Sequence, residues 1–300
     1  MKKLGTEIHG EMDFLLKNRN KMIEINLFDR EFSHTEKIVG YLTSTYYTKP
    51  KKIKWIKSEM SHDGITIFTD SYVLDPIVDQ VNSKIKIFWL MEPPAINNST
   101  YENIVKIEDK FDYILTYDEN LLKRSDKYIK YIVGQTRIDI PNIYPKSKFI
   151  SMIASNKRMS VGHRYRHEIA SFLHNKYDVH MWGSGYKGFN DKMQPLADYY
   201  FTISVMNCKM NNYFTEVLVD NFMCGTVPIF WGCPNIDEYF DINGIITFDT
   251  IEELDYILKN LTIDDYHNRM ESIKNNLITA EKYNLTDDYI ADILKQKFKL

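Results

Sequence analysis

Residues 200–231, YFTISVMNCKMNNYFTEVLVDNFMCGTVPIFW, contain two short apolar runs with a helical stretch between them. The runs at 200–205 and 226–231 have the length and composition of buried strands. Thr215 can cap the start of a helix that extends to about Met223, and Gly225 suits its C-terminal end. This order predicts a strand–helix–strand unit of a parallel α/β sheet.

The same pattern extends in both directions along the chain. Further strands are predicted at 22–28, 65–69, 84–90, 111–117 and 128–133, and then at 149–154, 177–182 and 244–248. Helices are predicted at 164–175, 266–282 and 287–299, and after the capping box formed by Thr250 and Glu253. The alternation predicts an α/β fold of two Rossmann-like units facing a cleft.

Residues 139–148, DIPNIYPKSK, carry two prolines among polar residues and are interpreted as the linker between the units. The predicted division is an N-terminal domain at 1–143 and a C-terminal domain at 144–282. Ligands of such units bind beyond the carboxyl ends of the strands, so the cleft is the expected site.

The composition is that of an ordinary folded protein. Of 300 residues, 44% are hydrophobic and 26% charged, and the formal net charge is -3. These values argue against disorder and against a basic surface for nucleic acid. The three cysteines fit no disulfide framework, and neither a signal peptide nor a membrane span is evident. We therefore expect a cytoplasmic protein with no integral membrane segment.

Residues 183–188, GSGYKG, match G-x-G-x-x-G after a predicted strand, which taken alone indicates dinucleotide binding. Pro195 follows closely, and no acidic residue clearly ends a next strand at the expected distance. The motif therefore indicates either a glycine loop whose backbone approaches a nucleotide or an ordinary turn.

Charged residues follow several predicted strands. Lys157, Arg164 and Arg166 come after strand 149–154, and guanidinium groups suit phosphate oxygens. Glu216 opens the helix after Thr215, where a diphosphate is favoured and a carboxylate can accept from ribose hydroxyls. Glu92 follows strand 84–90, a position suited to a general base. Each residue also fits an ordinary structural role.

His163 and His167 lie four residues apart, a spacing that can bind a metal on a helix. A third ligand is not evident in the sequence. We interpret both as structural or solvent-exposed residues and predict no metal site.

Several segments together resemble one family. Residues 213–216, YFTE, and 225–236, GTVPIFWGCPNI, strongly resemble the C-terminal signature of the α1,3/4-fucosyltransferases, glycosyltransferase family 10. Residues 89–94, WLMEPP, resemble the family's acidic motif, and residues 153–166 resemble its donor-phosphate segment. The chain most resembles the compact bacterial and viral members without a membrane anchor.

The resemblance implies a GT-B glycosyltransferase that transfers L-fucose with inversion from GDP-β-L-fucose to a hydroxyl of a glycan acceptor. It implies an α1,3-type linkage to N-acetylglucosamine or glucose, in glycan biosynthesis such as protein glycosylation. No cofactor would be required, and a divalent metal, Mn2+ or Mg2+, would at most stimulate transfer. The partners would be the donor and the acceptor, with no nucleic acid. Residues 283–300 would form a helix that packs back on the N-terminal domain.

The resemblance also assigns roles by motif position. Glu92 corresponds to the catalytic base, and Arg166, or less well Arg164, would hold the diphosphate. The remaining donor-binding residues would be Glu216, Asn207, Tyr213, Thr215, Gly183, Gly185, Ser155, Asn156 and Lys157.

Two departures from the family pattern leave alternatives open. Val217 stands where the family commonly has Lys, and Met206 where it commonly has Glu. A cation near the phosphates and a carboxylate near the sugar are thus absent, and Lys157, Lys187 or Lys209 could substitute for the cation. The alternatives are a transferase using a different GDP-hexose, a non-catalytic GDP- or glycan-binding relative, and a dinucleotide-dependent oxidoreductase. The sequence does not identify the acceptor.

Overall fold

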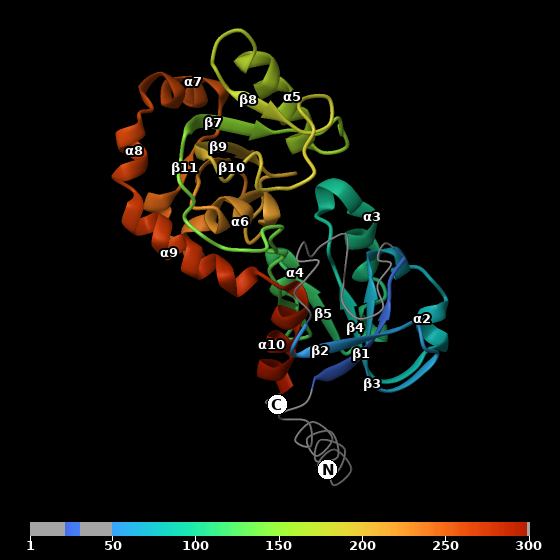
Figure 1. Ribbon diagram of the computed structural model, residues 1–300. Helices are drawn as coiled ribbons and strands as arrows, with labels where there is room; N and C mark the ends of the chain where they lie inside the picture. The colour runs from blue at the N-terminus through green and yellow to red at the C-terminus, as the bar shows by residue number, and fades with distance from the viewer. Residues whose placement is uncertain (1–21, 31–49, 299–300) are drawn as a thin grey trace.

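The computed structural model describes residues 22–30 and 50–298. Within them the strands form two parallel sheets, one in each half of the molecule (Figure 1). The predicted α/β fold with two sheets is confirmed. Parts of the predicted N-terminal domain, at 1–21 and 31–49, and the end of the predicted last helix lie outside the described residues.

The first sheet has six strands in the order β2-β1-β3-β4-β5-β6, all paired in parallel. Its strands are β1 (Ile23–Phe28), β2 (Ile53–Lys57), β3 (Ser61–Thr69), β4 (Asn82–Trp89), β5 (Tyr113–Thr116) and β6 (Tyr128–Lys130). Its helices are η1 (Asp70–Tyr72), α2 (Ile77–Gln80), α3 (Pro94–Ile104), η2 (Glu108–Lys110) and α4 (Glu119–Leu122). The central strands are buried at consecutive positions, as expected for a parallel sheet covered on both faces.

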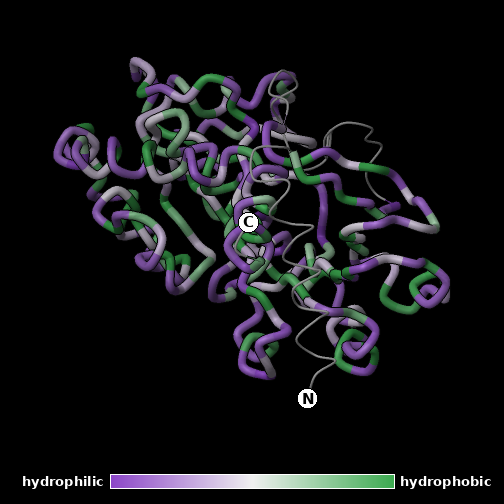
Figure 2. Tube along the Cα trace, turned by 90° about the horizontal axis from the view of Figure 1, so that it is seen from below, coloured by the Kyte–Doolittle hydropathy of each residue, from purple (hydrophilic) through white to green (hydrophobic). Residues whose placement is uncertain are grey.

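The second sheet has five parallel strands in the order β11-β10-β9-β7-β8. Its strands are β7 (Lys148–Ile153), β8 (His180–Trp182), β9 (Tyr199–Val205), β10 (Val227–Trp231) and β11 (Ile246–Thr247). Its helices are α5 (Val161–Leu173), α6 (Glu216–Met223), η3 (Ile236–Glu238), η4 (Ile242–Gly244), α7 (Ile251–Asn260), α8 (Ile263–His267), α9 (Met270–Ala280) and η5 (Glu281–Tyr283). Along the outer helices, hydrophilic and hydrophobic residues alternate within each turn (Figure 2), as amphipathic helices require.

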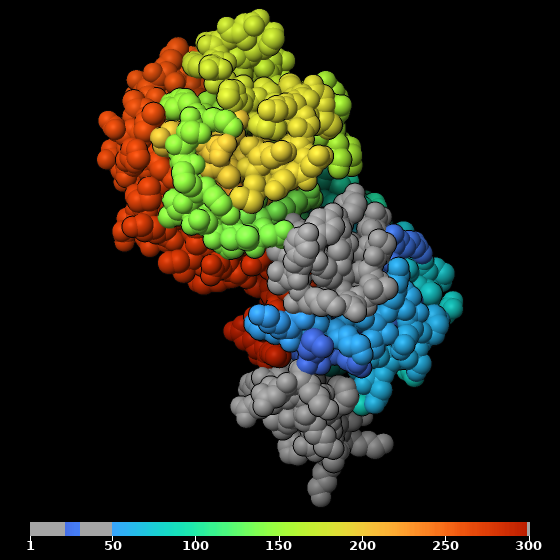
Figure 3. All heavy atoms as spheres, in the orientation of Figure 1, coloured from blue at the N-terminus to red at the C-terminus, as the bar shows by residue number. Residues whose placement is uncertain are grey.

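The last helix, α10 (Thr286–Phe298), lies against the first sheet rather than the second (Figure 1). Ile290, Ala291 and Leu294 are fully buried in the same apolar cluster as Trp55 of β2. The Asp288 carboxylate accepts the backbone N–H of Lys52 at 2.8 Å. The space-filling view shows two lobes, with the red helix beside the blue strands of the lower one (Figure 3).

Two elements differ from the sequence-based expectations. β2 is not among the predicted strands. Its sequence mixes apolar residues with lysines over only five positions, which gives no continuous apolar run. In the structure Ile53 and Trp55 are buried, and Lys54 and Lys57 are exposed. Helix α5 begins at Val161, earlier than predicted, because Ser160 caps it and His163 completes a capping box. The division at 143/144 stays a prediction; the first sheet ends at Lys130 and the second begins at Lys148.

No helix in the described part of the chain is both long and apolar enough to cross a membrane. The three cysteines, Cys208, Cys224 and Cys233, are buried thiols that form no disulfide.

Candidate active site

A cavity of about 890 Å³ lies between the carboxyl-terminal ends of the two sheets. The first sheet contributes residues that follow β1, β3 and β4, and the second contributes residues that follow β7, β8 and β9. Parallel α/β sheets bind ligands at this edge, because the strand ends leave a crevice there. The predicted cleft is therefore present.

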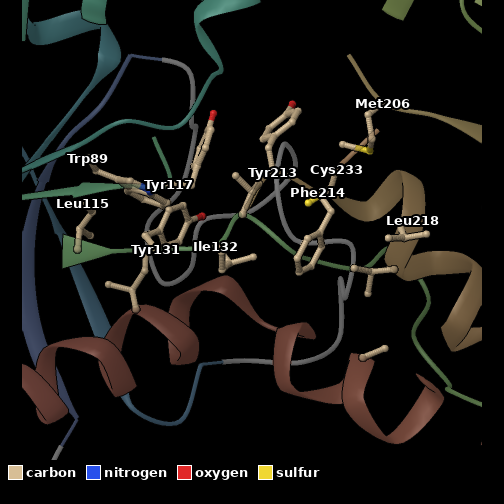
Figure 4. Close-up of a cluster of buried hydrophobic side chains, with 14 of the residues drawn as sticks. Trp89, Leu115, Tyr117, Tyr131, Ile132, Met206, Tyr213, Phe214, Leu218 and Cys233 are labelled. Carbon is tan, nitrogen blue, oxygen red and sulfur yellow. The ribbon is translucent and has the colours of Figure 1, made fainter. Parts of the chain in front are cut away.

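The floor of the cavity belongs to a core that both halves share. Tyr131 and Tyr213 line the cavity and are also members of one apolar cluster, which includes Trp89 from the first sheet and Leu218 from α6. Figure 4 shows these side chains packed together above the C-terminal helices. Buried side chains from both halves thus pack together beneath the two walls of the cavity.

The wall formed by the first sheet is acidic. Asp29, Asp70 and Glu92 line it, and they follow the neighbouring strands β1, β3 and β4. Glu92 is exposed within the cavity. Burial raises the pKa of the Cys208 thiol to about 12, and the Glu92 carboxylate adds to this shift. Glu92 therefore lies close enough to Cys208, which follows β9, for its charge to act on the thiol.

The wall formed by the second sheet is basic, and Arg166 lies deepest in it. The Arg166 Nε donates to the backbone carbonyl of Val205 at 2.8 Å, and Nη2 donates to Asn207 Oδ1 at 3.1 Å. Burial lowers the pKa of Arg166, although Glu216 and Tyr213 oppose the shift. These bonds fix the guanidinium plane at the end of β9 and orient Asn207 beside it.

Helix α6 directs its N-terminus at the cavity. Thr215 is its N-cap, and its hydroxyl accepts the backbone N–H of Val217 at 3.3 Å, as predicted. Thr215, Glu216 and Val217 all line the cavity. The positive end of the helix dipole therefore faces the space in which an anion would sit.

Glu216 is ionised and paired with cations that the sequence did not indicate. Burial would raise its pKa, but the charges of Arg137 and Lys192 lower it below the ordinary value. The Arg137 Nη2 lies 3.7 Å from Glu216 Oε1. Lys192, whose side chain is only 11% exposed, lies 3.7 Å from the buried Asp220 carboxylate. Both cations line the cavity.

The glycine turn after β8 borders the cavity without forming a dinucleotide motif. Gly183 lines the cavity, and a Cβ there would lie 2.0 Å from the Ala154 carbonyl oxygen, so the turn needs glycine for close packing. No helix follows the motif; the next one, α6, begins at Glu216. The motif therefore lacks the helix N-terminus on which dinucleotide binding depends.

The structure brings most predicted donor residues together. Those that line the cavity are Ser155, Lys157, Arg166, Gly183, Asn207, Tyr213, Thr215 and Glu216, and the predicted base Glu92 lines it as well. Arg164 is exposed outside the lining, with Nη1 3.4 Å from the Arg158 carbonyl oxygen. Asn156 and Gly185 also lie outside the lining, where they adjoin one another.

Of the lysines predicted to replace the missing cation, one lines the cavity. Lys157 does so, whereas Lys187 stacks 4.3 Å above the Trp182 ring and Lys209 pairs with Asp249. Val217 lines the cavity as an apolar residue, and Met206 is buried against Gly232. Lys192 and Arg137 lie in loops that contain no recognisable motif. Only the folded structure shows that both residues line the cavity.

His163 also lines the cavity, and it is held by the start of α5. Its Nδ1 lies 2.8 Å from the Ser160 hydroxyl within the capping box. Burial lowers its pKa to about 4, and the charges of Arg166 and Lys157 contribute. The imidazole is therefore neutral near pH 7. Within the described residues, no group of three or more His, Cys, Asp or Glu side chains is arranged to hold a metal ion.

Comparison with known proteins finds a family resemblance in the second half of the chain. Residues 143–271 match the model of the glycosyltransferase family 10 (fucosyltransferase) C-terminal region. Residues 143–271 therefore resemble the C-terminal region of this family, and the resemblance found in the sequence is supported. The matched segment contains β7 to β10 and α6, and hence the basic wall.

One curated relative is the alpha-(1,3)-fucosyltransferase FucT of Helicobacter pylori. It is 24% identical over 199 residues, which cover 63% of this chain and 38% of that protein. This chain thus spans well under half the length of that relative.

Solved structures of similar fold include an alpha1,3-fucosyltransferase with GDP-fucose, with a TM-score of 0.55 and 16% identity over 93% of this chain and 91% of that one. Alr3699/HepE of Anabaena in complex with UDP-glucose has a TM-score of 0.57 and 13% identity, with 79% of each chain covered. At these identities the similarity shows the fold. It confirms the predicted GT-B arrangement.

Proposed function

We propose that this protein transfers L-fucose from GDP-β-L-fucose to a hydroxyl of a glycan acceptor, with inversion at the anomeric carbon. The observation that carries the proposal is the polarity of the cavity. Cations and a helix N-terminus line the wall from the second sheet, and carboxylates line the wall from the first. A dianionic diphosphate fits the first environment, and a base that activates a hydroxyl fits the second.

In this proposal the diphosphate lies against the second sheet. Arg166, Lys157 and Lys192 meet its oxygens, and Glu216 accepts from ribose hydroxyls. Preorganised cations stabilise the charge that develops on a departing diphosphate. The side chains of Asn207 and Tyr213 and the turn at Gly183 border the nucleoside sugar. Arg164 has no contact role, because it lies outside the cavity lining.

The acceptor hydroxyl approaches from the wall that carries Glu92. The Glu92 carboxylate takes the hydroxyl proton while the acceptor oxygen forms a bond to the anomeric carbon. The bond from that carbon to the β-phosphate oxygen breaks, and its electron pair leaves with GDP. Attack opposite the leaving group converts the β-linked donor into an α-linked product. The α1,3-type linkage to N-acetylglucosamine or glucose belongs to the proposal and rests on the family.

Transfer is proposed to require no resident metal, because the cations of the second wall can neutralise the diphosphate. Assays with EDTA and with added Mn2+ or Mg2+ test this point. We expect EDTA to leave most of the turnover and a divalent ion to raise it by a few fold at most. Loss of turnover in EDTA that returns with metal would contradict it.

Calorimetric titration with GDP, GDP-fucose, GDP-mannose and UDP, followed by transfer assays on a glycan panel, tests the function. We expect selective binding of GDP and GDP-fucose and transfer of fucose only. Glu92→Gln should keep donor affinity and lose turnover by 100-fold or more, on the order expected for a general base. Binding without transfer to any acceptor, with Glu92→Gln unchanged, would instead indicate a non-catalytic relative.

A second candidate is transfer from a different GDP-hexose. It is favoured by Val217, which presents an apolar side chain to the cavity where the family commonly has a cation. Preference for GDP-mannose over GDP-fucose in the same titration would select it.

A further inference from the structure

The backbone that carries Glu92 is held by side chains at each of its polar groups. The Asp70 carboxylate accepts the N–H of Met91 at 3.1 Å through Oδ1 and the N–H of Glu92 at 2.9 Å through Oδ2. The Tyr117 hydroxyl donates to the Met91 carbonyl at 3.2 Å. The Tyr101 hydroxyl donates to the Glu92 carbonyl at 3.1 Å. We call Asp70, Tyr101 and Tyr117 the Glu92 clamp.

The clamp replaces the hydrogen bonds that a continuing strand would make. β4 ends at Trp89, so Met91 and Glu92 have no strand partner, and backbone polar groups need partners wherever water is excluded. Pro93 comes next, with φ at -73°, which fixes the chain on the other side. Each member comes from a different element: η1 after β3, helix α3, and the loop after β5.

The protonation states of the clamp suit this task. Burial raises the pKa of both tyrosine hydroxyls well above the ordinary value, so they remain donors throughout the working pH range. Burial raises the pKa of Asp70 to about 7; the two N–H groups oppose this shift, and the carboxylates of Glu92 and Asp29 add to it. The titratable groups that face Asp70 are Glu92, Asp29, Tyr101, Tyr117 and Tyr131.

We propose that Asp70, Tyr101 and Tyr117 are positioning residues for Glu92, which hold its backbone in place beyond the end of β4. The inference rests on the proposed role of Glu92 in transfer. Catalytic groups must be held to a fraction of an ångström, and a displacement of about 1 Å can cost about 100-fold in rate. The carboxylate of an exposed glutamate beyond the end of a strand is held to such a position only if the backbone that carries it is fixed.

Hydrogen exchange of the full chain tests the clamp without reference to activity. In Asp70→Asn the amide keeps one acceptor oxygen, but its NH2 group opposes the second N–H. At pH 8 we expect the Met91 and Glu92 amides to exchange about tenfold faster, as for the loss of a bond to a charged acceptor. Asp112→Asn is the control, because Asp112 accepts the Lys86 N–H at 2.7 Å outside the cavity. Unchanged exchange at Met91 and Glu92 in Asp70→Asn would overturn the proposal.

Kinetics then test the consequence for transfer. Asp70→Asn should lower kcat about 10- to 100-fold with donor affinity unchanged. A folded Asp70→Asn variant with wild-type kcat would contradict the proposal.

Tyr101→Phe and Tyr117→Phe decide the matter if Asp70→Asn does not fold. Each should lower kcat with donor affinity unchanged, whereas Tyr128→Phe, which removes a hydroxyl bonded to Glu108 outside the cavity, should not. Wild-type kcat in both variants would overturn the proposal. If the wild-type chain transfers no sugar while Asp70→Asn still exposes the two amides, the proposed function fails and the clamp stands.

Discussion

The ring of Tyr117, from the first half of the chain, packs against the ring of Tyr213, from the second, with centroids 5.1 Å apart. Both side chains are fully buried. The Asn212 Nδ2 donates to the Tyr117 carbonyl at 3.2 Å beside them. The two domains therefore meet through direct packing at the floor of the cavity, and Tyr117 also donates to the backbone next to Glu92.

A double-mutant cycle measures this contact. Tyr117→Leu and Tyr213→Leu should each destabilise the chain, and their coupling energy in denaturant unfolding should be about 0.5–1.5 kcal/mol, as for other aromatic pairs. The cycle between Tyr117 and Tyr266, which belongs to a different apolar cluster, is the control and should be additive. A coupling near zero for Tyr117 and Tyr213 would show that the packing does not join the domains.

Lys192→Met should weaken GDP binding by about 10- to 100-fold, because a buried cation that meets phosphate contributes about as much as one charged hydrogen bond. Titration calorimetry at fixed salt gives the dissociation constant. Lys187→Met is the matched control, since Lys187 stacks on Trp182 outside the cavity lining. Equal affinity in the two variants would exclude Lys192 from the donor site.

The stability of the chain should depend on Asp220. Burial raises the pKa of this carboxyl from 3.8 to about 6, with Lys192 opposing the shift and Glu216 adding to it. The folded state then binds a proton that the unfolded state has lost, so the free energy of unfolding falls as pH rises from about 4 to about 6.

Asp220→Asn should remove this part of the pH dependence and stabilise the chain above pH 6 by up to about 3 kcal/mol. The variant keeps an oxygen for the Thr136 hydroxyl and the Arg137 N–H, which Asp220 Oδ1 accepts in the native chain. Denaturant unfolding at pH 4.5 and pH 7 measures the difference. A variant with the same slope between these pH values as the native chain would refute the assignment.

Gly162→Ala should destabilise the chain by about 1–3 kcal/mol, the usual cost of overpacking, and weaken GDP binding. The added Cβ would lie 1.8 Å from the Met206 carbonyl oxygen, so α5 must move away from β9. Arg166 lies one turn further along α5 and would move with it. Gly188→Ala, whose Cβ meets no atom within 4 Å, is the control for stability. Comparable stability of the two variants would contradict the prediction.

Local rules predicted the elements that local residues determine. Thr215 caps α6 as expected, and Gly225 follows its end with φ at +63°. The Thr250 capping box is half formed: the Thr250 hydroxyl accepts the Glu253 N–H, whereas the Glu253 carboxylate accepts the Asp249 N–H. Strand and helix periodicity were sufficient for the two-sheet fold.

The rest of the site depends on contacts between distant residues. Lys192 and Arg137 lie in loops without regular structure, and only the folded chain brings them to Glu216. Asp70 precedes Glu92 by a whole strand, so no spacing rule links them. Arg164 and Arg166 are the same residue type and lie two positions apart. Their different directions around helix α5 decide which of them lines the cavity.

Because helix α10 packs on the first sheet, the two domains can complete their folds at different times during translation. The strands of the first sheet have all been synthesised once Lys130 is added, but Trp55 and its neighbours gain their apolar cover only when Ile290 and Leu294 are available. The second sheet lies wholly within residues 148–247, with its helices following directly. The core of the second sheet can therefore form before the residues that complete the core of the first sheet have been synthesised. The domain that carries Glu92 is translated first and finished last.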